Sequence, residues 1–381
     1  MLHQPHELHE LPADLRSLPL AAVERAVVAL GEKPYRARQL FRWLHQKGAA
    51  SLDEMSDLPR ALREALAARF TLRTLEAAEE KRSSDGTIKW KWRTFDGRFV
   101  ESVYMPHTSD EDGDTNNRDR RTLCVSTQVG CAVGCQFCLT GTMGLVRNLG
   151  AGEIADQIHR ANRRIVELGL AEGPRPLTNL VFMGMGEPLH NFDNVKTALN
   201  EILLAEDGPN FSHRHVTVST SGIVPQIRRL GEETQVKLAI SLNATTDAQR
   251  DVLMPLNRRW PLDELLAACR AFPMKQGRRI TFEYVLLGGV NDSDADAERL
   301  AGLLRGIPAK VNVIPYNENP GLGFKAPPPE RVEAFQDILV RRNVTAVVRR
   351  NRGRDISAAC GQLAAEGGPG DPRRRTAARA G

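Results

Sequence analysis

The chain has 381 residues, of which 41% are hydrophobic and 26% are charged, and its formal net charge is +5. This length predicts about two to three domains, or one barrel with an appendage. Apolar runs stay shorter than the ~20 residues of a membrane span, and the N-terminus has no apolar signal core. Six cysteines in so long a chain are not a disulfide scaffold. Membrane, secreted and fibrous proteins are disfavoured, so we expect a cytoplasmic protein without membrane contact.

The N-terminal part is expected to be helical after a flexible leader over residues 1–18. Within residues 19–75, three segments place apolar residues three or four positions apart, and a proline stands near the start of each. This pattern predicts a small accessory domain of helices. Its middle helix contains Arg36, Arg38 and Arg42, which either bind RNA or only face the solvent.

Residues 76–121 are expected to form a β-hairpin followed by a polar loop. The segments TIKWKWRTFD and RFVESVYMP alternate in polarity and are joined at Asp96-Gly97, which is a turn signal for a hairpin. The following stretch, 107–120, contains no residues that could form a core.

Strand-like and helical segments alternate from residue 122 onward. The six strand-like segments are 122–127, 177–184, 215–221, 236–243, 279–287 and 310–317. Their nearly continuous apolar character predicts parallel strands that are buried on both faces. Six units are too few for a closed eight-stranded barrel. We therefore predict an α/β fold with a partial (β/α)6 barrel over residues 122–366, with a doubly wound sheet as the alternative. Residues 344–351 are expected to add an edge strand, and 367–381 a disordered basic tail.

A cluster of cysteines follows the first of these strands. Cys131, Cys135 and Cys138 lie within GCAVGCQFC, and chemistry in parallel α/β folds gathers at the carboxyl ends of strands. A structural zinc site needs four ligands, whereas three thiolates suit a [4Fe-4S] cluster with one open iron. The spacing resembles that of radical S-adenosylmethionine (SAM) enzymes, in which SAM chelates the open iron.

Small polar residues stand at the ends of the later strands. The turn MGMGEP permits a close backbone approach, and its glutamate can accept a hydrogen bond from an ammonium group. It resembles the GGEP-type element of radical-SAM barrels. The expected SAM-binding residues are Gly186, Glu187, Ser219, Ser241, Leu242, Asn243 and Asn317. Singly, such residues are more often helix caps or turn residues.

Several motifs together resemble the RlmN-type enzymes, and the resemblance covers residues 20–366. The motifs are CVSTQVGCAVGCQFC, VFMGMGEPLHN, VTVSTSG, VNVIPYN and VRRNRGRDISAACGQL. The resemblance implies methylation of C2 of an adenine in 23S-type rRNA, at the peptidyl-transferase centre, and of the adenine next to the anticodon in some tRNAs. It also implies a [4Fe-4S] cluster, two SAM per turnover, an electron donor of the flavodoxin or ferredoxin type and a thiol reductant. We expect a monomer.

The resemblance also implies roles for two thiols and a carboxylate. Adenine C2 is an electron-poor carbon, so ordinary methyl transfer from SAM fails and a radical route is needed. Cys360 is methylated by one SAM, and a radical from the second SAM removes a hydrogen atom from that methyl group. The resulting carbon adds to C2, Glu101 accepts the C2 proton, and Cys124 attacks the Cys360 sulfur to give a transient disulfide.

The residues alone leave other interpretations open. From spacing alone, Cys124 and Cys360 are ordinary packing residues, as is Cys269. Glu101 in VESVYMP matches the family's proton acceptor, but the insert 107–120 leaves a surface glutamate as an alternative. Two rival functions are a Cfr-type enzyme that methylates C8 of the rRNA adenine and a non-catalytic, metal-containing RNA-binding protein. The helical domain and the VESVYMP strand favour C2.

Overall fold

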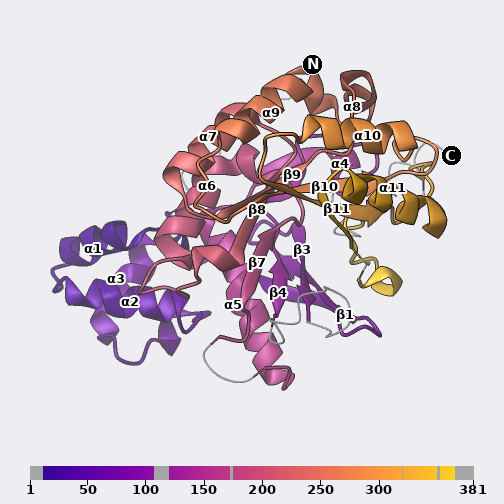
Figure 1. The fold of residues 1–381 in the computed structure, drawn as a ribbon. Helices are drawn as coiled ribbons and strands as arrows, with labels where there is room; N and C mark the ends of the chain where they lie inside the picture. Colours follow the sequence, from indigo (N-terminus) through magenta and orange to yellow (C-terminus); the bar gives the residue numbers. More distant parts are fainter. Residues whose placement is uncertain (1–11, 107–119, 172–174, 320, 350–351, 365–381) are drawn as a thin grey trace, which may run out of the picture.

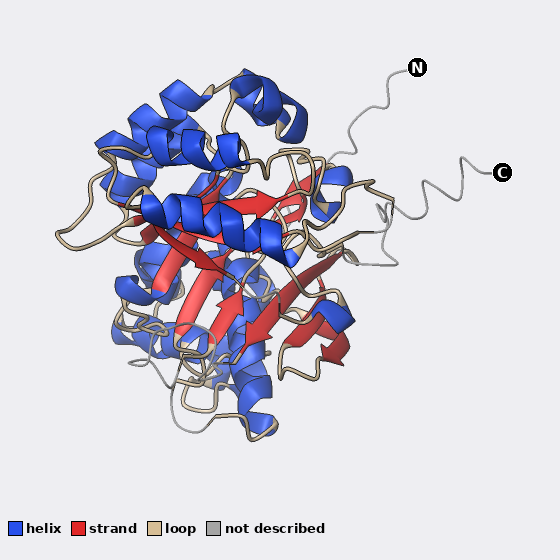
Figure 2. Cartoon of the chain, turned by 45° about the vertical axis from the view of Figure 1, so that its right-hand side comes forward, coloured by secondary structure: helices blue, strands red, loops and turns tan. Residues whose placement is uncertain are grey.

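The computed structural model describes residues 12–106, 120–171, 175–319, 321–349 and 352–364. Ten of the described strands form one sheet in the order β1-β2-β3-β4-β7-β8-β9-β10-β11-β12. Helices cover the outside of this curved sheet (Figure 1, Figure 2). The predicted α/β fold with an open barrel is therefore confirmed. Most of the polar loop 107–120 and the whole tail 367–381 lie outside the described residues.

The barrel itself is the parallel part of the sheet. Its strands are β4 (Thr122–Cys124), β7 (Asn179–Phe182), β8 (Val216–Thr220), β9 (Lys237–Ser241), β10 (Ile280–Leu286), β11 (Ala309–Pro315) and β12 (Thr345–Val348). Leu180, Val218 and Phe282 are fully buried, as their apolar runs predict. The edge strand expected after residue 344 is β12, which pairs with β11. Because the strands are parallel, their carboxyl ends share one edge of the sheet.

The predicted hairpin extends the barrel sheet and contains an additional strand. Strands β1 (Glu76–Arg82), β2 (Ile88–Arg93) and β3 (Phe99–Met105) are antiparallel, and β3 pairs antiparallel with β4. Strand β1 was not expected, because EAAEEKR lacks alternating apolar residues and most of it is exposed. Strand β3, at the edge of the hairpin, therefore lies next to the first barrel strand.

The N-terminal domain contains the three predicted helices, α1 (Leu20–Ala29), α2 (Tyr35–His45) and α3 (Arg60–Arg69). The leader predicted over residues 1–18 is wrong at its end, because Leu15 and Arg16 are fully buried in a short 3-10 helix. The Arg16 guanidinium lies in the junction between the helical domain and the barrel, where it contacts Leu44, Ala49 and Asp156.

The remaining helices cover the barrel or shape its loops. They are α4 (Leu139–Thr142), α5 (Ala151–Glu167), α6 (Phe192–Lys196), α7 (Val224–Glu233), α8 (Asp247–Leu253), α9 (Leu262–Ala271), α10 (Asp294–Leu303) and α11 (Pro329–Arg341). Strands β5 (Gln128–Gly130) and β6 (Leu145–Asn148) form a separate antiparallel pair. Cys269 is fully buried in α9, as a packing residue should be. Within the described part of the chain, no helix combines the length and apolar character needed to cross a membrane.

Removing the Arg16 guanidinium should destabilise the fold. Its Nη1 lies 3.3 Å from Asp156 Oδ1, and both side chains are fully buried. The guanidinium also donates to the carbonyls of Leu44 at 2.8 Å and Ala49 at 2.5 Å. We expect Arg16→Met to lower the free energy of unfolding by about 3–5 kcal/mol, because a buried carboxylate loses a counter-ion. Denaturant titration measures this loss.

Arg38→Met is the matched control. Arg38 lies 3.9 Å from Asp207 with 68% of its side chain exposed, and such exposed pairs contribute about 0–1 kcal/mol. Equal losses in the two variants would show that the junction does not depend on Arg16.

Candidate functional site

The three clustered cysteines lie in the loop between β5 and α4. Each is half-buried and carries a free thiol. The amide of Cys131 donates to Gly144 O at 3.1 Å, and the amide of Cys138 donates to Cys135 O at 3.3 Å. Gly141 keeps the loop tight, since a Cβ there would lie 2.6 Å from Cys135 O. The loop brings the three thiols close enough to interact electrostatically.

The surroundings of these thiols suit sulfur ligands of a metal cluster. Burial raises the pKa of all three, that of Cys131 to about 12, so a bare thiolate is disfavoured without a cation. Backbone amides donate to two of the sulfurs: those of Val133 and Gly134 to Cys131, and those of Thr140 and Gly141 to Cys138. Such donors stabilise thiolate ligands.

The described residues contain no group of three His, Cys, Asp or Glu side chains spaced to hold a single metal ion. A cubane cluster makes a different demand, because each cysteine binds a different iron atom.

Glu187 follows β7, and its side chain contacts the residues that follow β8, near the cysteine loop. Its carboxylate is 2% exposed and accepts hydrogen bonds from the amides of Leu189 at 3.0 Å and Ser221 at 2.7 Å. Burial raises the pKa of Glu187. The preceding Gly186 has φ +100°, and a Cβ there would lie 2.6 Å from Gln128 Cβ. The close backbone approach predicted for this turn is therefore present.

Three other predicted residues present polar groups at the same end of the barrel. The hydroxyls of Ser219 and Ser241 lie 3.4 Å apart on neighbouring strands. Asn317 is 1% exposed. Neither the oxygen nor the nitrogen of its side-chain amide has a hydrogen-bond partner among the described residues. A buried amide without a partner is costly, so Asn317 points to a place for a polar ligand.

Two of the residues predicted to bind SAM form hydrogen bonds with other parts of the protein. Asn243 has φ +58°, and its side-chain oxygen accepts from the Val285 amide at 2.9 Å. Leu242 is fully buried, and its carbonyl accepts from Arg250 Nε at 3.0 Å. These two residues shape the backbone at the mouth of the barrel.

The segment 352–364 forms hydrogen bonds with both the hairpin and the cysteine loop. At its start, the amide of Gly353 donates to Asp85 Oδ2 at 2.9 Å. Near its end, the carbonyl of Gly361 accepts from the Leu139 amide at 2.9 Å, and the Thr140 hydroxyl donates to Leu363 O at 2.5 Å. Residues far apart in the sequence therefore meet at one end of the barrel.

This segment brings Cys360 to Cys124. The two thiols interact electrostatically, and Cys360 also interacts with Cys138 of the cysteine loop. Burial raises the pKa of Cys124 to about 12. Cys360 is exposed to solvent, although the protein around it also raises its pKa by desolvation. An accessible thiol thus lies within electrostatic range of a buried one.

Glu101 shares the face of the sheet on which Cys124 lies. Val103 pairs with Cys124 across β3 and β4, and Glu101 is two positions from Val103, so it is on the same face. Its carboxylate is 2% exposed, lies 3.4 Å from Lys89 Nζ and accepts from the Ala364 amide at 3.1 Å. The alternative of a surface glutamate is wrong.

A buried carboxylate near Cys360 was missed by the sequence analysis. Glu283 in β10 is 6% exposed and accepts from Asn312 Nδ2 at 2.9 Å. Its Oε2 lies 3.9 Å from Arg349 Nη1, and both residues interact electrostatically with Cys360. A charged residue within the apolar run RITFEYVLL was the available signal, because such a charge must be paired inside the barrel.

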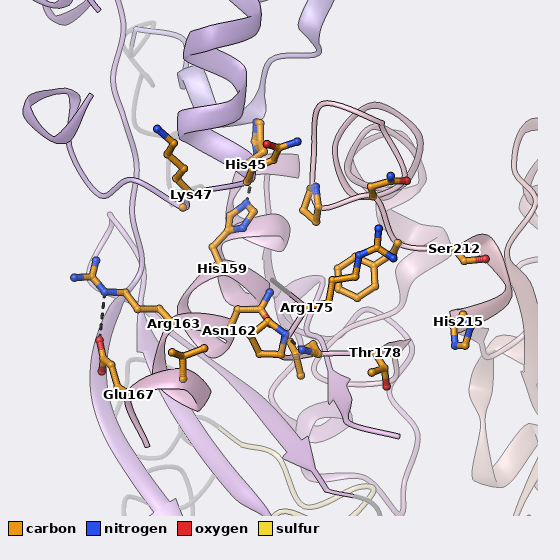
Figure 3. A pocket seen from close by; sticks show the side chains of 18 residues that line it. His45, Lys47, His159, Asn162, Arg163, Glu167, Arg175, Thr178, Ser212 and His215 are labelled. Carbon is orange, nitrogen blue, oxygen red and sulfur yellow. Dashed lines mark hydrogen bonds and ion pairs between the residues drawn. The ribbon is translucent and has the colours of Figure 1, made fainter. Parts of the chain in front are cut away.

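A separate cavity of about 670 Å³ opens where the helical domain meets the barrel (Figure 3). It is lined by Thr178 and His215, which precede β7 and β8, and by His45 and His159. The ring nitrogens of these last two lie 3.4 Å apart, and burial lowers the pKa of both. The cavity lies at the amino ends of the strands and contains none of the predicted site residues.

Comparisons with known proteins agree on one family. Residues 125–301 match the radical SAM superfamily, and residues 13–72 match the ribosomal RNA large subunit methyltransferase N-terminal domain. The chain is 73% identical to the dual-specificity RNA methyltransferase RlmN of Anaeromyxobacter dehalogenans (strain 2CP-C), covering 97% of each chain. It is 61% identical to RlmN 2 of Myxococcus xanthus (strain DK1622), over 93% of this chain and 91% of the relative. A crystal structure of a radical SAM methyltransferase from Sphaerobacter thermophilus is 50% identical, covers 93% of this chain and 100% of that chain, and has a TM-score of 0.85.

The turn before Glu187 should tolerate only glycine. We expect Gly186→Ala to destabilise the protein by about 1–3 kcal/mol, because the residue needs a positive φ and the new Cβ would meet Gln128. Gly302→Ala in α10 is the control, since its Cβ would have nothing within 4 Å and alanine favours a helix. Thermal unfolding of both variants checks this, and a Gly186→Ala protein that melts with the wild type would contradict it.

Proposed function

The chain belongs to the RlmN family of dual-specificity radical-SAM RNA methyltransferases, and on this premise we propose its substrates and the roles of its residues. The proposed substrates are an adenine of 23S-type rRNA and the adenine next to the anticodon in some tRNAs, each methylated at C2. The observation that carries the proposal is the meeting of Cys360, Cys124 and the cysteine loop at one end of the barrel.

Enzymes of the radical SAM superfamily use SAM and a [4Fe-4S] cluster, and we propose which residues hold them. Cys131, Cys135 and Cys138 are the proposed cluster ligands, and the backbone amides that donate to the sulfurs of Cys131 and Cys138 support this. The cluster and SAM supply the radical that removes a hydrogen atom. The proposed SAM-binding residues are Gly186, Glu187, Ser219, Ser241, Leu242, Asn243 and Asn317. The unpartnered amide of Asn317 is the strongest support for this set.

Cys360 is proposed to carry the methyl group to the RNA. It first accepts a methyl group from one SAM, and it then loses a hydrogen atom from that group, so that each turnover uses two SAM. The carbon on its sulfur forms a bond to adenine C2. An exposed thiol beside the cysteine loop supports this role, because the RNA base and the source of the radical must both reach it.

Glu101 and Cys124 are proposed to complete the reaction. Glu101 accepts the proton from adenine C2. Cys124 then loses its thiol proton and attacks the Cys360 sulfur, so that a sulfur–sulfur bond forms and the bond from sulfur to the transferred carbon breaks. That carbon takes up a proton to become the methyl group. The unpaired electron of the adduct would return to the cluster, which would act as the one-electron acceptor. Burial keeps the Cys124 thiol protonated at neutral pH by raising its pKa to about 12. A thiol reductant reopens the disulfide, and an electron donor of the flavodoxin or ferredoxin type supplies electrons.

The proposed function predicts a specific product. Anaerobically reconstituted protein, given SAM, reductant and either an rRNA fragment or tRNA, should yield 2-methyladenosine, which mass spectrometry of the digested RNA identifies. Cys360→Ala should retain the cluster and form no methyladenosine, because the carrier sulfur is missing. The isomer 8-methyladenosine would refute the C2 assignment. Stoichiometric zinc without any cleavage of SAM would refute the claim that the protein is a radical-SAM enzyme.

A further inference from the structure

Lys89 is an almost completely buried lysine in strand β2. Its side chain is 4% exposed, and its Nζ lies 3.4 Å from Glu101 Oε1. The same ammonium donates to the carbonyl of Ser357 at 3.0 Å. Lysine is seldom buried unless it is paired, and the burial of such a pair costs free energy. This lysine therefore calls for an explanation beyond packing.

The Lys89–Glu101 pair holds the Cys360 segment on both sides of the thiol. Lys89 binds the carbonyl of Ser357 before Cys360, and Glu101 accepts from the amide of Ala364 after it. Ser357 has φ +53°, a strained conformation that persists only where neighbouring contacts maintain it. The contact with Lys89 is one of these. Cys360 thus lies between two bonds to the same ion pair.

The sheet register puts this pair in line with the second thiol. Lys89 is the direct partner of Val103 in β3, and Val103 is the direct partner of Cys124 in β4. Residues directly opposite each other in a sheet place their side chains on the same face. Lys89 therefore lies in one row with Cys124, on the face that holds Glu101.

We propose that Lys89 is a positioning residue that fixes Glu101 and the Cys360 segment relative to each other. Its ammonium holds the carboxylate that accepts the proton and the backbone that carries the methylated sulfur, so that both face the same adenine. The inference rests on the proposed function, because it uses the roles of Glu101 and Cys360 given there.

The test begins with three variants in a Cys124→Ala background, in which the missing thiol should leave the RNA attached to Cys360. Lys89→Met removes the ammonium, and Lys89→Arg keeps a cation. Lys81→Met is the control, because Lys81 is the partner of Lys89 in β1 but is 37% exposed and pairs with Glu79 at the surface. Two quantities are measured: the fraction of Cys360 that becomes methylated without RNA, by peptide mass spectrometry, and the yield of protein–RNA adduct.

We expect Lys89→Met to lower both quantities at least about tenfold, because a misplacement of ~1 Å at a reacting group costs on the order of 100-fold. Lys89→Arg should recover part of each, and Lys81→Met should match the parent. Glu101→Gln in the same background should instead methylate Cys360 and accumulate adduct. Its side chain keeps an oxygen for the Ala364 amide, and proton removal follows adduct formation.

One outcome refutes the positioning role. If Lys89→Met methylates Cys360 and forms adduct as well as the parent does, as we expect of Glu101→Gln and Lys81→Met, then Lys89 does not position the Cys360 segment. If the parent forms no adduct with RNA, the proposed function fails, and the positioning role fails with it.

A double variant, Lys89→Met with Glu101→Gln, separates positioning from misfolding, because it leaves no unpaired charge in the interior. Iron content and the melting temperature establish that it is folded. We expect a folded, iron-loaded protein that still methylates Cys360 poorly. Normal methylation of Cys360 in this variant would overturn the proposal.

Discussion

The docking of segment 352–364 across the mouth of the barrel is the constraint on which the rest of the site depends. Backbone hydrogen bonds tie it to the cysteine loop through Leu139 and Gly361, and the Asp85 carboxylate ties its start to the hairpin. These bonds bring an exposed thiol from the C-terminal part of the chain to a buried thiol in the first barrel strand. The hairpin can take part only because β3 pairs with β4 and so continues the barrel sheet.

Buried charge is the second organising feature of the site. Glu101, Glu187 and Glu283 are almost completely buried, and each is stabilised differently. Glu101 forms an ion pair with a lysine. Glu187 accepts hydrogen bonds from two backbone amides. Glu283 accepts a hydrogen bond from a side-chain amide and has an arginine nearby. Because unpaired interior charges are costly, these contacts fix where the carboxylates lie. The amide of Asn317, in contrast, has no partner in the described structure and is suited to a ligand.

The sequence predictions that are confirmed rest on local patterns. Apolar runs predict the parallel strands, and spacing within one loop brings Cys131, Cys135 and Cys138 together. Long-range contacts account for the misses. Strand β1 has no apolar alternation and is ordered by its pairing with β2, and Arg16 is buried by carbonyls and a carboxylate from distant segments. The approach of Cys360 to Cys124 has no signature in their spacing, so only the family resemblance predicted it, and their chemical roles stay predictions.

The most direct test is the state of these two thiols after a single turnover without thiol reductant. If Cys124 releases the product by attacking Cys360, one disulfide between them should appear for each adenine methylated. Mass spectrometry of the linked peptides and of the digested RNA would quantify both. We expect equal amounts of the disulfide and of the methylated adenine. Methylated adenine accompanied by two free thiols would contradict the roles proposed for Cys124 and Cys360.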